Sequence, residues 1–447
     1  MKLCILVQNL YTLGGIQRVV TTILNELVND DSYSITIVMP FKMRGEKLFK
    51  IDERIKLRNL DELSVNRDHK PVRYIFALNK RIGFLDSDMF LPFVFNNRIA
   101  ALEKKNYIEF FNTEKFDIII GAGVEYSLLL GEIKENITAK TIGWQHSTYD
   151  SYFEKRGATG YGLMKYVKKC YSALDGIWVL TKSDKREFDS NLGINSKVLY
   201  NPLPQKDGVR TTYEKGHVVF AGRLEREHKG LDYLVEVLKR ILEEVPELTV
   251  DIIGDGPSNN WLKKELEEAE LGKIANLVGI TDNVYQFYGK ASVMVQTSRW
   301  EGFGMTILEA MSCGVPVVAF HNYGPDEIIR NSVDGYLINK FDTDAFAQKV
   351  VELLKQPERK RQMGKCAIER SQDFNLEKVL PLFKRYLEEA MRGLLNEQAI
   401  KQKKGINAKY GTYGDIPNCD GIIWFRFAEH DFEYLWCKFT WIYNDGL

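Results

Sequence analysis

The chain lacks most of the features that would place it among metal-binding, secreted or membrane-spanning proteins. Its six cysteines are scattered over 447 residues, and no two stand at the Cys-x-x-Cys spacing of a zinc or redox site. Scattered free thiols are typical of a reducing compartment. No apolar run approaches the ~18 residues of a membrane span. The first run, Leu3–Val7, is too short for the apolar core of a signal peptide. We therefore expect a cytoplasmic protein.

Net charge is also absent. Lysine and arginine together number 61, and so do aspartate and glutamate, so the formal net charge is zero at pH 7. No general attraction to nucleic acid is expected from such a balance. A hydrophobic content of 45% and a charged content of 27% are typical of soluble globular proteins. At this length the chain has enough residues for two domains, each with its own core.

Short apolar runs alternate with longer helical patterns along both halves of the chain. The expected strands are 3–7, 35–38, 118–120, 141–144 and 176–180, followed by 218–221, 248–253, 276–278, 292–296 and 315–319. The expected helices include 15–28, 231–244, 260–268 and 345–354. This alternation predicts an α/β fold with two doubly wound, parallel sheets. In such sheets a ligand crevice lies at the carboxyl ends of the strands.

Prolines and glycines mark the boundary between the two halves. Pro202, Pro204 and Gly208 predict a linker. We expect a first domain over 1–204, a second over 205–373, an amphipathic helix over 374–395 and an aromatic-rich tail over 396–447. The tail is either a small β addition or a non-native extension, and no chemistry is assigned to it.

Two carboxylates bracket an expected strand-to-helix loop in the second half. Glu301 and Glu309 are separated by seven residues, which begin with Gly302, Phe303 and Gly304. Glycines let the backbone approach a ligand closely, and the free N–H groups of a helix start favour an anion. A phosphate held there would leave one carboxylate on each side to accept hydrogen bonds from hydroxyls, as a nucleotide sugar requires. The alternative is a capping loop with two solvated glutamates.

Three further segments stand in a fixed order before this loop. They are Gly14-Gly15-Ile16-Gln17-Arg18-Val19, then Phe220-Ala221-Gly222-Arg223-Leu224 with Lys229-Gly230, then Ile253-Gly254-Asp255-Gly256-Pro257. Together with Glu301 and Glu309, this ensemble resembles the large retaining glycosyltransferase family 4, which has the GT-B fold. Gln17 stands where that family usually has an acid. The resemblance runs from residue 1 to about 395.

The resemblance implies two Rossmann-like domains that face a central cleft, with a nucleotide-diphosphate sugar as donor. It implies that Glu309 binds the ribose hydroxyls and that Glu301 binds hydroxyls of the donor hexose. It also implies that His146, which follows the expected strand 141–144, lies beside the donor sugar. The alternative for His146 is a satisfied or surface histidine.

Fixed cations are needed where the leaving diphosphate gains negative charge. Arg223 follows an expected strand and Gly222, so its guanidinium can reach a diphosphate with two hydrogen bonds. Lys229, before Gly230, adds a point charge. Solvated surface cations are the alternative for both. With both present, no metal is needed, and Asp86-Ser87-Asp88 is interpreted as a solvated turn rather than a metal site.

The expected catalytic residues are therefore His146, Arg223, Lys229 and Glu301. The expected donor-binding residues are Gly14, Gly15, Arg223, Lys229, Gly302, Phe303, Gly304 and Glu309. Gly14 and Gly15 open a helix after the first strand, so their N–H groups can face the diphosphate from the first domain. No cofactor and no essential metal are expected.

The hypothesis is a retaining glycosyltransferase that moves a hexose or N-acetylhexosamine to a glycan or lipid-linked acceptor. Synthesis of a bacterial surface polysaccharide, such as a capsule, is the expected process. One alternative is a nucleotide-sugar epimerase on the same fold. The other is a non-catalytic nucleotide-sugar-binding protein, against which the intact Arg223, Lys229, Glu301 and Glu309 argue.

Cations and large apolar residues are mixed over residues 67–95, with Lys80 and Arg81 near the middle. Such a mixture suits peripheral contact with an anionic membrane at its inner face. It equally suits a solvated helix followed by a core segment, and both interpretations stay open.

Overall fold

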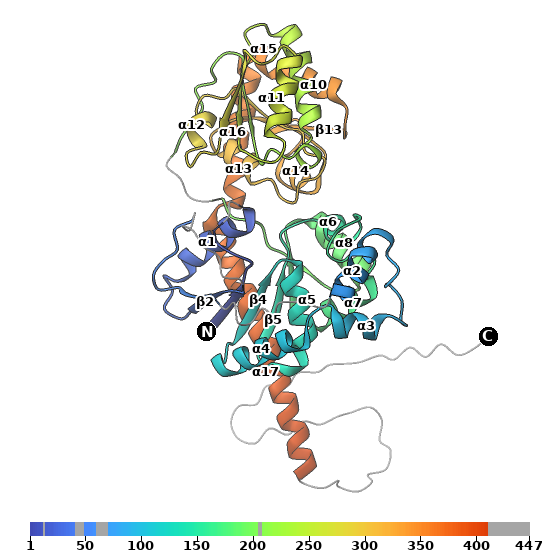
Figure 1. Cartoon of the computed structure of the whole chain (residues 1–447). Helices are drawn as coiled ribbons and strands as arrows, with labels where there is room; N and C mark the ends of the chain where they lie inside the picture. The colour runs from blue at the N-terminus through green and yellow to red at the C-terminus, as the bar shows by residue number, and fades with distance from the viewer. Residues whose placement is uncertain (12–13, 41–48, 60–69, 204–207, 410–447) are drawn as a thin grey trace, which may run out of the picture. The chain divides into compact units, whose positions relative to one another are not determined.

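The structure, a computed structural model, describes residues 1–11, 14–40, 49–59, 70–203 and 208–409 (Figure 1). The chain divides into two compact units, 1–395 and 396–447. Residues outside the described ranges include 204–207 of the expected linker, 67–69 at the start of the mixed cationic and apolar segment, and the aromatic run of the tail. The account below therefore concerns the first unit.

The first half forms a parallel sheet of seven strands in the order β3-β2-β1-β4-β5-β6-β7. Its strands are β1 (Lys2–Leu6), β2 (Ser34–Met39), β3 (Lys56–Asn59), β4 (Ile118–Ala122), β5 (Lys140–Trp144), β6 (Gly176–Val179) and β7 (Lys197–Val198). Leu3 and Ile5 of β1 pack with α1, whereas Cys4 and Leu6 pack with α4 and α5. Successive side chains of a strand point to opposite faces, so both faces of β1 are covered.

Eight helices of the described residues belong to this half. They are α1 (Gly15–Leu27), α2 (Lys70–Ile82), α3 (Leu91–Asn97), α4 (Ala101–Glu114), α5 (Val124–Ile133), α6 (Tyr149–Phe153), α7 (Met164–Ala173) and α8 (Lys182–Leu192). Figure 1 shows α5 beside β4 and β5, in agreement with their packing.

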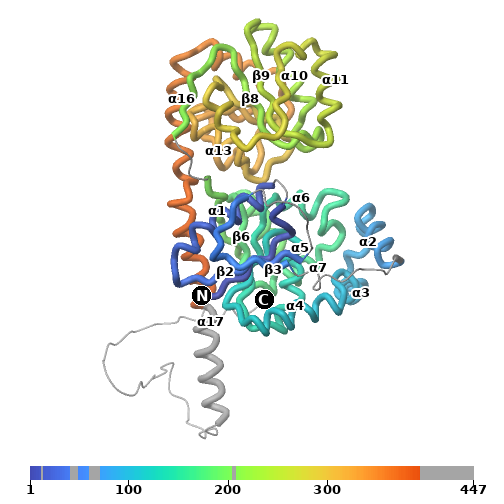
Figure 2. Tube along the Cα trace, turned by 60° about the vertical axis from the view of Figure 1, so that its left-hand side comes forward, coloured from blue at the N-terminus to red at the C-terminus, as the bar shows by residue number. Residues whose placement is uncertain are grey.

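The second half forms a parallel sheet of six strands in the order β10-β9-β8-β11-β12-β13. Its strands are β8 (His217–Ala221), β9 (Thr249–Ile253), β10 (Ala275–Gly279), β11 (Val293–Gln296), β12 (Val317–Phe320) and β13 (Gly335–Ile338). Val218 and Phe220 of β8 pack with α10, and Val219 and Ala221 pack on the opposite face with α12 and α13. Figure 2 shows β8 and β9 beside α10. The expected pair of parallel α/β sheets is confirmed.

The helices of the second half are α9 (Arg226–Lys229), α10 (Leu231–Glu244), α11 (Asn259–Glu268), α12 (Tyr285–Tyr288), α13 (Met305–Ser312), α14 (Tyr323–Ile328), α15 (Thr343–Lys355) and α16 (Pro357–Ser371). The long helix α17 (Leu376–Lys409) then buries Val379, Phe383 and Leu387 in the core of the first sheet. These residues are spaced by four, which places them on one face of the helix. The helix was expected to end at residue 395, but in the structure it continues to Lys409.

Within the described ranges, no helix combines the length and the apolarity that crossing a bilayer requires.

Candidate active site

The loop between β11 and α13 presents Glu301. Its Oε2 accepts hydrogen bonds from Lys229 Nζ at 2.5 Å and from Gln296 Nε2 at 3.0 Å. The loop reaches α13 through Gly304, whose φ of +96° lies in the left-handed region. A Cβ at this position would also lie 2.9 Å from Ile307 Cδ1. Gly304 therefore sets the direction in which the helix leaves the loop.

Lys229 and Glu301 form a largely buried ion pair, with side chains 11% and 13% exposed. Burial by itself raises the pKa of Glu301, but the charge and hydrogen bond of Lys229 outweigh it and hold that pKa below its usual value. The Gln296 amide acts in the same direction. Glu301 is thus a fixed carboxylate, and all its lone pairs remain acceptors.

Two glycines shape the backbone around Lys229. Gly230 ends α9 with a φ of +59°, and a Cβ there would lie 2.1 Å from Thr297 O. Gly222 follows β8, and a Cβ there would lie 3.4 Å from Lys229 Cε. The lysine side chain therefore passes over a position without a side chain on its way to Glu301.

Arg223 lies on the loop after β8, but the structure does not bring it to Glu301. Its side chain is 70% exposed, and its Nε lies 3.8 Å from Glu225 Oε2. The backbone of this loop nevertheless packs closely against Gly254. A Cβ on residue 254 would lie only 1.9 Å from Gly222 O, so only glycine fits there. Arg223 is therefore an exposed cation on a closely packed loop.

Glu309 lies in the second turn of α13 and is 1% exposed. Its Oε1 is paired with a guanidinium nitrogen of Arg18, which comes from α1 of the first half. Neither Glu301 nor Glu309 is solvated, so the interpretation as a capping loop with two solvated glutamates is wrong. The Gly14–Arg18 segment and the Glu301–Glu309 segment meet in the folded chain.

Gly14 precedes α1 in an extended conformation, and no side chain caps this helix among the residues described. A Cβ at Gly15 would have nothing within 4 Å. A Cβ at Gly14, in contrast, would lie 2.4 Å from Gln17 Oε1, so the Gln17 side chain folds back over the first turn of α1. Binding of an anion at this helix start stays a prediction. Phe303 is buried and stacks on Tyr200 at 6.0 Å between ring centroids. It supports the loop.

His146 follows β5 and packs on Trp144, with ring centroids 4.5 Å apart. Both ring nitrogens are buried, and neither has a hydrogen-bond partner within the described part of the chain. Burial lowers the pKa of His146 to about 3, so the ring is neutral at pH 7. Its carbonyl oxygen lies 3.5 Å from the place of a Cβ at Gly302. The structure thus places the backbone of His146 beside the loop that carries Glu301 (the carboxylate loop), while the ring packs on Trp144. The role of His146 beside the donor sugar stays a prediction.

Three residues of this region were not assigned from the sequence. Arg18 binds Glu309, Gln296 binds Glu301, and the buried Tyr288 hydroxyl has no hydrogen-bond partner among the described atoms. Burial and, second, the charge of Glu309 raise the pKa of Tyr288. The sequence held a signal for two of them: Arg18 lies in the segment Gly14–Val19, and Gln296 is a polar residue that ends an apolar strand.

Asp86, Ser87 and Asp88 lie in a turn, as expected. Asp86 accepts a hydrogen bond from Lys165 N at 2.8 Å, and Asp88 pairs with Lys165 Nζ at 2.7 Å. The turn is thus attached to α7 through Lys165. In the described ranges no three His, Cys, Asp or Glu side chains are grouped to hold a metal ion. Independence from metal stays a prediction.

The sequence model of the family Glycosyl transferases group 1 matches residues 206–370. This segment belongs to the group 1 glycosyl transferases. It contains Arg223, Lys229, Glu301 and Glu309, so the carboxylate loop and both cations lie inside the glycosyl transferase segment.

Curated relatives extend the likeness to the first half. The amylovoran biosynthesis glycosyltransferase AmsD of Erwinia amylovora is 22% identical over 389 residues, 85% of this chain and 97% of that protein. An alpha-1,4-N-acetyl-D-galactosaminyltransferase of Campylobacter jejuni is 24% identical over 85% of this chain and 96% of its own. The poly(glycerol-phosphate) alpha-glucosyltransferase of Bacillus subtilis is 29% identical over 208 residues, and this chain spans only 31% of its length.

Solved structures show the same fold. TarM of S. aureus superposes with a TM-score of 0.66 at 17% identity and covers 86% of this chain and 99% of its own. The lipopolysaccharide outer core galactosyltransferase WaaB superposes with a TM-score of 0.63 at 18% identity. The match covers 87% of this chain and 99% of WaaB. These likenesses concern the fold alone and confirm the GT-B architecture.

Proposed function

We propose that this glycosyl transferase is a retaining enzyme that moves a hexose or N-acetylhexosamine from a nucleotide-diphosphate sugar to a glycan or lipid-linked acceptor. The observation that carries the proposal is the buried Lys229–Glu301 ion pair next to the start of α13. That helix also holds the buried Glu309. The cation and the helix start then bind the diphosphate of one ligand. The two carboxylates bind the hydroxyls on either side of that diphosphate.

In this proposal, the cations and the carboxylates of the site bind different parts of the donor. The diphosphate binds the N–H groups at the starts of α1 and α13, with Lys229 beside it. The exposed Arg223 swings onto the diphosphate as negative charge develops on it. Glu301 accepts hydrogen bonds from the donor sugar, and Glu309 exchanges Arg18 for the ribose hydroxyls. The neutral His146 ring offers one donor and one acceptor to the sugar.

The chemical step breaks the bond between the anomeric carbon and the diphosphate oxygen and forms a bond to the acceptor oxygen on the same face. The acceptor hydroxyl gives its proton to the leaving phosphate oxygen, so the step needs no covalent nucleophile. Lys229 and Arg223 stabilise the leaving group most when its charge is greatest.

The process is assigned to bacterial surface polysaccharide synthesis at the inner face of the cell membrane. AmsD takes part in amylovoran biosynthesis by its name, and the Campylobacter relative acts on a glycan linked to undecaprenol diphosphate by its own. We extend this acceptor class to the present chain.

An exposed apolar stripe on α2 supports peripheral membrane contact. Tyr74, Leu78 and Ile82, spaced by four, are 74%, 50% and 62% exposed, whereas Asn79 on the inner side is 1% exposed. Lys80 and Arg81 are exposed in the last turn. Apolar residues beside cations are the pattern of a helix that lies on an anionic bilayer.

A panel of nucleotide-diphosphate sugars, each incubated with and without a lipid-linked acceptor, tests the proposal. We expect a glycosylated product only with acceptor, and proton NMR should show the donor's anomeric configuration in it. Conversion of the donor without acceptor would support the epimerase. Binding with no product under any condition would support the non-catalytic alternative. An inverted anomeric centre would contradict the retaining mechanism.

A further inference from the structure

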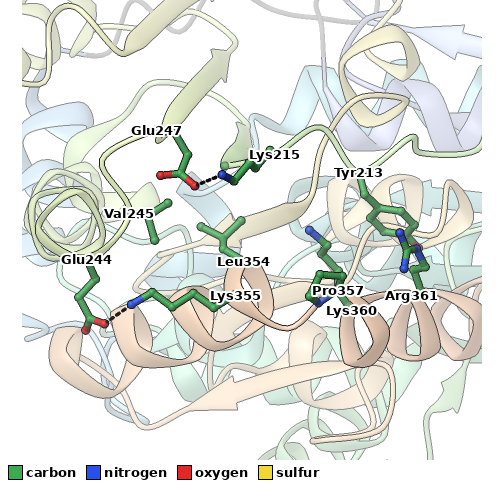
Figure 3. Close-up of a pocket in the computed structure, with 11 residues that line it drawn as sticks. Tyr213, Lys215, Glu244, Val245, Glu247, Leu354, Lys355, Pro357, Lys360 and Arg361 are labelled. Carbon is green, nitrogen blue, oxygen red and sulfur yellow. Dashed lines mark hydrogen bonds and ion pairs between the residues drawn. The ribbon is translucent and has the colours of Figure 1, made fainter.

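A cavity of about 410 Å³ lies away from the candidate active site, before the amino-terminal end of β8 in the second sheet. Gly216, just before β8, and Lys215 line it, together with the turn between α15 and α16. The carboxylate loop, in contrast, follows the far end of β11. Figure 3 shows Lys215 above Leu354 and Lys355 below it, with Lys360 and Tyr213 to the right.

Lys360 is the unusual residue of this cavity. It is 5% exposed, and its Nζ donates to Ser292 Oγ at 2.8 Å. No carboxylate of the described residues pairs with it. A buried ammonium normally has an anionic partner, because removal of its hydration is costly. Burial, and then the charge of Arg361, lowers the pKa of Lys360. The carboxylates that line the cavity, Glu244 and Glu247, pair with Lys355 and Lys215 and not with this ammonium.

The rim carries further cations that can move. Lys215 pairs with Glu247 at 3.0 Å, and Lys355 pairs with Glu244 at 2.8 Å. The two lysine side chains are 85% and 52% exposed, and exposed pairs of this kind hold weakly. Both lysines can therefore turn toward a ligand in the cavity.

The wall behind Lys360 is rigid. Tyr213 has a φ of +57°, which is rare for a residue with a side chain, and its hydroxyl donates to Gly314 O at 2.8 Å. Its ring centroid lies 5.6 Å from Lys360 Nζ. The helix α16, of 15 residues, starts at this cavity with Pro357, and no side chain of the described residues caps it. Its dipole adds to the positive potential.

We propose that this cavity binds a small phosphate-bearing anion, with the Lys360 ammonium as its buried anchor and Lys215 and Lys355 as its outer contacts. The volume lies in the range of small-molecule sites, about 300–1,000 Å³, and leaves room for an organic group besides the phosphate. The ligand class is a phosphomonoester, or free phosphate with water beside it.

Calorimetric titration of the full chain with inorganic phosphate, glycerol 3-phosphate and uncharged glycerol tests the site. We expect saturable binding of one or both phosphates and none of glycerol. Tighter binding of glycerol 3-phosphate would identify a phosphomonoester as the ligand, and equal binding would identify free phosphate. The absence of saturable phosphate binding would overturn the proposal.

Variants locate the binding. Lys360→Met should weaken it at least tenfold, whereas Lys264→Met, an exposed lysine on α11, should leave it unchanged. The double variant Lys215→Gln/Lys355→Gln changes exposed side chains alone and should weaken binding severalfold. Unchanged affinity in the folded lysine variants of the cavity would overturn the proposal. So would loss of binding on Arg223→Ala alone, because the phosphate would then occupy the donor site.

Discussion

Arg18 and Glu309 form an ion pair between α1 of the first half and α13 of the second, across 291 positions of the sequence. The Glu309 side chain is 2% exposed and that of Arg18 is 26% exposed. Water can therefore reach the guanidinium but hardly the carboxylate. A ribose that binds Glu309 has to take over the hydrogen bond that Arg18 now donates.

The first prediction concerns this carboxylate. Glu309→Gln should weaken the binding of UDP or GDP by about 1.5–3 kcal/mol, because a hydrogen bond to a charged acceptor is lost. Isothermal calorimetry measures the change. Glu358→Gln, an exposed residue on α16, serves as the control, and equal affinities for both variants would refute the assignment to ribose.

The second prediction concerns Arg223. Since its side chain is 70% exposed, Arg223→Ala should fold normally. It should lower kcat more than donor affinity, because the charge on the leaving diphosphate is greatest in the transition state. Steady-state kinetics and donor titration separate the two effects. A loss of equal size in both would assign Arg223 to ground-state binding.

Lys229 should behave differently, since it also supports the fold. Lys229→Ala leaves Glu301 largely buried without its cation, which costs on the order of 3–5 kcal/mol of the free energy of unfolding. Urea unfolding measures this loss. The double variant Lys229→Met/Glu301→Gln removes both charges and should regain much of the stability. No recovery in the double variant would contradict the ion-pair explanation.

The pH dependence of stability follows from His146. Its pKa is lowered from 6.5 to about 3 in the folded chain, so the unfolded chain binds more protons between these values. Stability from this group is therefore fully present above pH 6.5 and falls as the pH drops, by at most about 1.4 kcal/mol per pH unit. His146→Asn should flatten the urea-unfolding profile between pH 6.5 and 4. His321→Asn, at the surface, should not, and equal slopes in the two variants would exclude His146 as the cause.

Metal removal should leave activity largely intact, because Lys229 and Arg223 are placed to neutralise the diphosphate. Assays of the glycosylated product in EDTA, and again after addition of Mg²⁺ or Mn²⁺, measure this. A strict requirement for either ion would contradict the assignment of these two cations.

Membrane contact is tested on α2. Liposome co-sedimentation should require anionic lipid, decrease with salt and fall on Lys80→Glu/Arg81→Glu. Leu78→Ser should weaken it as well, because Leu78 is 50% exposed and lies on the apolar stripe. Lys263→Glu/Lys264→Glu on α11 is the control. Binding that depends neither on lipid charge nor on these substitutions would contradict membrane contact through α2 and favour the interpretation as a solvated helix.

The sequence by itself determined the repeating α/β pattern. The strand expected over 218–221 is β8 (His217–Ala221), and the helix expected over 231–244 is α10 with those bounds. The strand is buried along its whole length, and the apolar face of the helix is buried. Local chemistry was also sufficient to predict the carboxylate loop. A glycine such as Gly304 directly before a helical pattern predicts where the helix begins, independently of the tertiary structure.

Tertiary structure alone decided the elements and contacts without a local signal. β3 (Lys56–Asn59) is a short polar edge strand that is largely exposed, and its pairing with β2 defines it. β7 (Lys197–Val198), at an edge of the first sheet, has only two residues and so carries no periodic pattern. β13 (Gly335–Ile338), at an edge of the second sheet, is apolar and largely buried but was not predicted. The Lys229–Glu301 and Arg18–Glu309 pairs join residues 72 and 291 positions apart. A side chain's type shows which charge it carries, but only the packed sheets bring its partner within reach.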